Sequence, residues 1–117
     1  MSRAALDAVL AALAEPTRRQ LLDLLADRGE ASASTLAQVL PVTRQAVVKH
    51  LTVLDGAGLV SGRRAGREVL YRARPERLAE AARGLNDLAT AWESRLAAIR
   101  RLAEAPEPTD LDEGDRP

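Results

Sequence analysis

Cysteine is absent from this chain of 117 residues, and aromatic residues are nearly absent: there is one tryptophan, one tyrosine and no phenylalanine. Without cysteine the chain forms no disulfide and no thiolate metal site. Secreted domains of this size usually depend on such cross-links, so we expect a cytoplasmic protein. Without large rings, the hydrophobic core has to be built from leucine, valine and alanine, which suits packed helices.

Long apolar segments and a net charge are missing as well. No run approaches the roughly 18 apolar residues that cross a bilayer, and residues 1–9 lack the features of a signal peptide. The 17 basic and 17 acidic side chains cancel but are unevenly distributed. Residues 41–74 carry seven Lys or Arg and two acids, whereas residues 104–117 carry six acids and one Arg. A basic middle segment of this kind indicates nucleic-acid binding.

The spacing of apolar residues predicts five helices and one β-hairpin. The helices are expected at residues 4–14, 16–28, 35–40, 44–57 and 76–103. Ser34 and Thr43 are expected to cap the third and fourth helices, and residues 30–34 to form a loop or a brief strand. Two capped helices joined by a tight turn form a helix-turn-helix motif. The hairpin is predicted to turn at Ala65-Gly66.

The fourth predicted helix has two distinct faces. Val47, Leu51 and Leu54 share one face and should pack on the second and third helices. The other face has the side chains that read bases, since cations pair with guanine, amides with adenine, and methyl groups with thymine. It consists of Thr43 and Arg44 at the N-terminal end, then Gln45, Val48, Lys49 and Thr52. The alternative is an ordinary solvated face, but the adjoining capped helix and basic hairpin favour DNA.

The hairpin is the second predicted DNA contact. Arg63, Arg64 and Arg67 lie around Gly66, where cations can follow phosphates or enter a narrow minor groove. The alternative is a tip that only aids solubility. Three arginines within five residues favour contact with DNA.

Three segments of the chain carry a family resemblance, namely EPTRRQLLDLL, STLAQVLPVTRQAVVKHLTVLDGAGLV and GRRAGREVLYR. Through them, residues 5–103 resemble the winged-helix repressors of the ArsR family. Within them, the pattern V-x-x-H-L-x-V-L-x-x-A-G-L-V at residues 47–60 is fairly specific for that family. The resemblance implies a homodimer that pairs through its first and last helices, and a fourth helix that enters the major groove of operator DNA.

Metal sensing, for which the family is best known, is not expected. Thr35, Ala37 and Val39 stand in the helix where some members have cysteines, and the one histidine, His50, lies in the fourth helix instead of the last. We expect His50 to be partly buried, or to bond to backbone or phosphate. A single histidine without a carboxylate cluster is not a metal site, so no metal and no other cofactor is expected.

The last predicted helix has an apolar seam with seven-residue spacing, which requires a partner helix. The predicted dimer interface comprises Leu6, Leu10, Leu85, Leu88, Trp92, Leu96 and Ile99. A two-fold dimer places two recognition helices one DNA turn apart, roughly 34 Å, so the operator should be an inverted repeat. Trp92 could instead line a small-molecule pocket, although an interface role is favoured, and no effector is identified.

These observations predict a mainly α fold with a small β-hairpin. Residues 1–103 should form one winged helix-turn-helix domain for DNA binding and dimerisation, and residues 104–117 an acidic tail too polar to fold. The predicted function is a homodimeric repressor on double-stranded DNA. The alternative is a winged-helix module that binds protein only, which would not need the arginines. Without a P-loop, a thiol or a His–carboxylate pair, no enzyme is expected.

Overall fold

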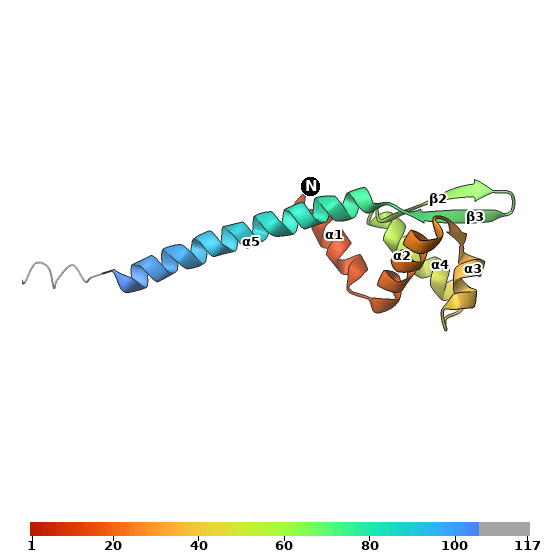
Figure 1. Ribbon diagram of the computed structural model, residues 1–117, viewed down its shortest axis with the longest axis horizontal. Coiled ribbons are helices and arrows are strands. Elements are labelled where there is room, and N and C mark those ends of the chain that lie inside the picture. Colours follow the sequence, from red (N-terminus) through yellow and green to blue (C-terminus); the bar gives the residue numbers. More distant parts are fainter. Residues whose placement is uncertain (106–117) are drawn as a thin grey trace, which may run out of the picture. The chain divides into compact units, whose positions relative to one another are not determined.

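The computed structural model describes residues 1–105 and is mainly helical with a small antiparallel sheet, as predicted (Figure 1). In chain order the elements are α1 (Arg3–Leu13), α2 (Pro16–Arg28), β1 (Ala31–Ser32), α3 (Ala33–Val39), α4 (Arg44–Gly56), β2 (Val60–Ala65), β3 (Glu68–Ala73) and α5 (Pro75–Glu104). Residues 1–84 form one compact unit, and α5 from Leu85 onward belongs to a second. The predicted acidic tail lies outside the described residues from position 106 on.

Thr43 caps α4 as predicted, because its hydroxyl oxygen accepts a hydrogen bond from the Ala46 amide at 3.1 Å. The predicted cap of α3 is wrong. Ser32, and not Ser34, accepts from the Thr35 amide at 3.1 Å, so α3 begins two residues earlier than expected. Pairing of Ser32 with Leu70 of β3 holds Ser32 in the extended backbone that an N-cap requires.

The core lies mainly among α1 to α4 and the sheet, with Ala81 of α5 at one side. Its buried side chains are aliphatic, and the half-buried ring of Tyr71 packs against it. Val47, Leu51 and Leu54 on the inner face of α4 are fully buried, as predicted. They belong to one cluster with fully buried side chains from elsewhere in the chain, which are Val9, Leu21, Leu25, Leu36, Leu59 and Val60. Each such side chain contributes roughly 1.5–3 kcal/mol to stability, and together they fix which face of α4 remains outside.

The sheet has the strand order β1-β3-β2. Ala65 pairs with Glu68, so the hairpin turns at Gly66-Arg67, one residue later than predicted. Gly66 has a φ of 66° at the first turn position, where type II′ turns favour glycine. Across the hairpin, Arg63 pairs with Leu70 and Arg64 with Val69. Because successive strand residues alternate in direction, these two arginines project from opposite faces.

Within the described residues, no helix combines the length and the apolarity that a membrane crossing needs.

Gly56 and Gly58 give a matched test of the turn that joins α4 to β2. Gly58 has a φ of 78°, and an added Cβ would lie 2.8 Å from Arg77 Nε, whereas Gly56 is helical with open space around it. We expect Gly58→Ala to lower the free energy of unfolding by about 1 kcal/mol or more, since alanine disfavours this backbone conformation. Gly56→Ala should leave the free energy of unfolding unchanged or raise it by up to about 1 kcal/mol. Urea unfolding measures both, and an equal loss in the two variants would contradict the account of the turn.

Candidate nucleic-acid interface

The outer face of α4 carries the predicted base-reading side chains together. Arg44, Gln45, Lys49 and Thr52 are exposed, as is the capping residue Thr43. Val48 is half-buried between this face and the core. Because the opposite face is buried, these six residues lie on the outward side of α4 and at its N-cap. Five of them are polar and exposed, and Val48 is the apolar member. The Thr52 hydroxyl donates to the Val48 carbonyl at 2.9 Å, which leaves the threonine methyl group and the hydroxyl lone pairs available.

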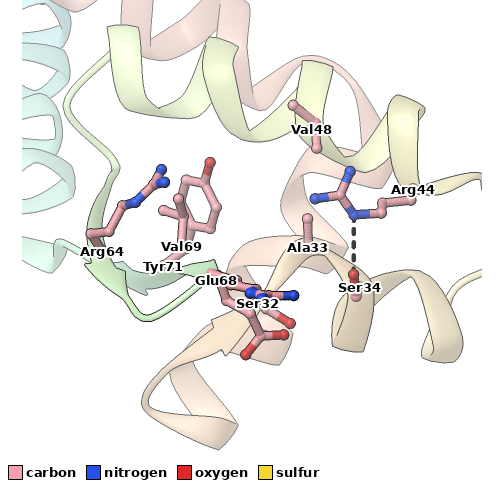
Figure 2. A pocket seen from close by; sticks show the side chains of 10 residues that line it. Ser32, Ala33, Ser34, Arg44, Val48, Arg64, Glu68, Val69 and Tyr71 are labelled. Atoms are coloured by element: carbon pink, nitrogen blue, oxygen red, sulfur yellow. Dashed lines mark hydrogen bonds between the residues drawn. The ribbon is translucent and has the colours of Figure 1, made fainter.

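A cleft of about 420 Å³ separates this part of α4 from the hairpin (Figure 2). Arg44 and Val48 reach it from α4, while Arg64 and Tyr71 project into it from the hairpin (Figure 2). The full lining is Ser32, Ala33, Ser34, Arg44, Val48, Arg64, Arg67, Glu68, Val69 and Tyr71. Three arginines and a single carboxylate therefore surround the cleft, which gives it a positive charge suited to a phosphodiester strand.

Ser34 acquires a role that the sequence did not indicate. Its hydroxyl oxygen accepts a hydrogen bond of 3.0 Å from Arg44 Nε (Figure 2). This bond joins α3 to the first residue of α4 and holds the Arg44 guanidinium at the cleft. The terminal nitrogens of Arg44 remain free to donate to a phosphate or a base.

Arg63 is not among the residues that line the cleft. Its Nε donates to Glu30 Oε2 at 2.7 Å and its Nη2 donates to Glu30 Oε1 at 2.9 Å. The hydrogen bond from Arg63 lowers the pKa of the Glu30 carboxyl below its ordinary value and raises the pKa of Arg63. Of the three hairpin arginines predicted to contact DNA, Arg64 and Arg67 line the cleft, whereas Arg63 is paired with Glu30.

His50 is half-buried, as one of the two expectations had it. Its ring nitrogens lie near side chains and not near backbone groups. Its Nδ1 lies 3.4 Å from Arg18 Nη1, and its Nε2 lies 3.7 Å from Glu15 Oε2. Arg18 also donates to the carbonyls of Ala12 at 2.6 Å and Ala11 at 3.1 Å, at the end of α1. This cluster connects the middle of α4 to the α1–α2 junction. Sequence reasoning missed Glu15 and Arg18 because they are more than 30 residues from His50.

The predicted dimer residues lie on α1 and α5. Leu10 is exposed on α1, and the side chain of Leu6 lies close to Gly84 of α5, where an added Cβ would be 3.5 Å from it. On the later part of α5, Leu85, Trp92, Leu96 and Ile99 are exposed by 42–61%, while Leu88 is half-buried. These five side chains recur on one side of the helix, so that part of α5 presents an apolar stripe in the single chain.

Thr35, Ala37 and Val39 lie on α3, which has no metal-ligating side chain. In the described part of the chain, no three His, Cys, Asp or Glu residues gather closely enough to hold a metal ion.

A helix-turn-helix followed by an arginine-bearing hairpin defines the winged-helix class of DNA-binding domains. Comparison with known proteins agrees, since the family model for a helix-turn-helix domain matches residues 13–63. The chain is 46% identical to an ArsR-like transcriptional regulator from Rhodococcus sp. RHA1, with a TM-score of 0.76 over 88% of this chain and 96% of that one.

Two curated relatives are similar along the sequence. The HTH-type transcriptional regulator Rv2034 of Mycobacterium tuberculosis is 39% identical over 80% of this chain and 84% of that protein. The uncharacterized regulator YuzN of Bacillus subtilis is 43% identical over 52% of this chain and 73% of that protein. This chain belongs to the ArsR family of helix-turn-helix transcriptional regulators.

The Glu30–Arg63 pair can be observed directly by NMR titration of side-chain carboxyl groups. We expect the pKa of Glu30 to lie below its ordinary value and to return toward it in Arg63→Gln, which removes the charged hydrogen-bond partner. Glu76 is the internal control, because its pKa is lowered chiefly by its own backbone amide. A Glu30 pKa that does not respond to Arg63→Gln would show that the pair does not form in solution.

Since the folded-state pKa of Glu30 is depressed, the pair contributes its stability above the unfolded-state pKa, and this contribution is lost as the pH falls through the folded-state value. The pair is therefore intact at neutral pH.

Proposed function

We propose that this chain represses transcription as a homodimer that binds an inverted-repeat operator with α4 in the major groove. The proposal rests on one observation: Arg44 and Val48 of the outer face of α4 line the same positively charged cleft as two hairpin arginines, Arg64 and Arg67. A helix of this width fits the major groove, and a cationic hairpin beside it meets the adjacent backbone.

The interface residues fall into two groups by chemistry. We assign base reading to Gln45, Val48, Lys49 and Thr52, whose amide, methyl and ammonium groups match base edges. We assign anchoring on phosphates to Thr43 and Arg44 at the N-terminus of α4, where backbone N–H groups are free, and to Arg64 and Arg67 on the hairpin. The sequence predicts Arg63 as a further anchor, but its guanidinium is bonded to Glu30.

A second copy of the chain is the proposed occupant of the apolar stripe. The exposed fractions of Trp92, Leu96 and Ile99 are 56%, 59% and 61%, and a stripe of such residues is costly in water. Their spacing matches helix-on-helix packing. We include Leu6 and Leu10 of α1 with Leu85 and Leu88 of α5 in the same interface, and we assign Trp92 to its core in preference to a ligand pocket.

DNA binding is tested by fluorescence anisotropy on fragments of the DNA upstream of the protein's own gene and on a random-sequence duplex of equal length. We expect Arg64→Gln and Arg67→Gln to weaken binding to both, and to lower the slope of log affinity against log salt by about 0.9 per lost contact. Gln45→Ala and Lys49→Ala should instead reduce the preference for the specific fragment, by about 1–3 kcal/mol per lost base contact.

Identical behaviour of the two groups of variants would refute the division into anchoring and reading residues. A protein that binds no duplex at any salt concentration would favour the module that binds protein only.

Dimerisation is tested by sedimentation equilibrium. Leu96→Asp should convert a dimer to a monomer, since a charge would then lie in the apolar seam, and should lower affinity for the inverted repeat by at least tenfold. Val53→Asp is the control, because Val53 is a similarly exposed aliphatic residue on α4, outside the proposed interface. A wild-type monomer, or a Leu96→Asp variant that remains dimeric, would contradict the proposed interface.

A further inference from the structure

The carboxylate of Glu30 binds the guanidinium of Arg63 in the geometry that a phosphate would use. The two carboxylate oxygens each accept one hydrogen bond from the guanidinium, at 2.7 and 2.9 Å. Arginine forms the same two-pronged contact with carboxylates and with phosphates. A DNA phosphate can therefore bind Arg63 fully only by displacing Glu30.

The hairpin register also directs Arg63 away from the cleft. Arg63 is paired with Leu70, whereas Arg64 is paired with Val69 and shares its face with Tyr71. Val69, Tyr71 and Arg64 line the cleft beside α4, and alternation places Arg63 on the reverse face. Arg72 is paired with Ser61 on that reverse face, and its charge also helps to lower the pKa of Glu30. Glu30 thus faces two of the cations that make the middle segment basic.

Stability of the fold does not account for this pair. The side chain of Arg63 is 60% exposed and that of Glu30 is 33% exposed. Water and salt screen an ion pair that is exposed to this extent, which limits what the pair adds to folding. The larger effect of the pair is on the charge that the hairpin, the wing of the winged helix, presents to a ligand. The Glu30 carboxylate offsets the positive charge of Arg63.

We propose that Glu30 acts as an internal substitute for a DNA phosphate and limits the sequence-independent affinity of the wing. Arg63 is then a positioning residue that ties the hairpin to the segment ahead of β1, and Arg64 and Arg67 supply the phosphate contacts. This inference rests on the proposed DNA binding and specifies how strongly the wing contributes to it.

The test measures affinity for a random-sequence duplex as a function of salt concentration, with the full-length chain. Glu30→Gln keeps the size of the side chain and removes its charge, so it frees Arg63 to find a phosphate. We expect Glu30→Gln to raise affinity at low salt by about fivefold and to steepen the salt slope by about 0.9. Arg63→Gln should change the slope by less than a third of the change caused by Arg64→Gln. The double variant Glu30→Gln with Arg63→Gln should return to the wild-type slope.

Three outcomes separate the possibilities once urea unfolding has shown that each variant folds. An equal loss of slope in Arg63→Gln and Arg64→Gln would overturn the inference, because Arg63 would then already contact DNA. Unchanged or weaker binding by Glu30→Gln would overturn it as well, since Glu30 would then restrain nothing. A wild-type chain without salt-dependent binding would refute the proposed function itself, which is a different result from either of these.

Discussion

The burial of one face of α4 is the constraint on which the rest of the structure depends. Val47, Leu51 and Leu54 are inaccessible to water, and this fixes the rotation of the helix about its own axis. Only then do Gln45 and Lys49, on the other side, point in a defined direction. Contacts of His50 with Glu15 and Arg18 hold the same helix against the α1–α2 junction. Arg18 is itself held there, because it donates to a carbonyl at the end of α1. A surface that reads bases needs this rigidity, because a base contact depends on side-chain placement to within a fraction of an ångström.

Alternation along a strand has a comparable effect on the hairpin. Adjacent arginines in the sequence, Arg63 and Arg64, are separated onto two faces by the pairing of β2 with β3. One meets the carboxylate of Glu30, and the other lines the cleft beside Arg44 and Val48. Fewer of the basic residues of the middle segment therefore line the cleft than the sequence of that segment contains. The cleft is nevertheless locally cationic in a chain with no net charge, because basic residues are concentrated in the middle segment and three arginines line the cleft.

Local chemistry made the order of elements and the inner face of α4 predictable from the sequence. Helix periodicity, Pro16 at a helix start and the Thr43 cap each depend on neighbours within a few residues. The prediction of the α3 cap failed because either Ser32 or Ser34 could cap the helix locally, and a distant strand determines which one does. Ser32 is the cap because β1 pairs with β3. The contacts that refine the site join residues 10 to 33 positions apart, as in Ser34 with Arg44 and Glu30 with Arg63. A single sequence holds no local signal for such pairs, whereas the outward face of α4 followed directly from the inward one.

Hydroxyl-radical footprinting of the wild-type protein on the DNA upstream of its own gene tests the central claim most directly, because it records where on the duplex α4 and the wing lie. The account predicts two protected blocks related by a two-fold axis, with centres about 10 base pairs apart and flanking protection of the backbone where the wings reach it. Protection that is absent at low salt, or that forms a single block without symmetry, would contradict a dimeric reader built on α4.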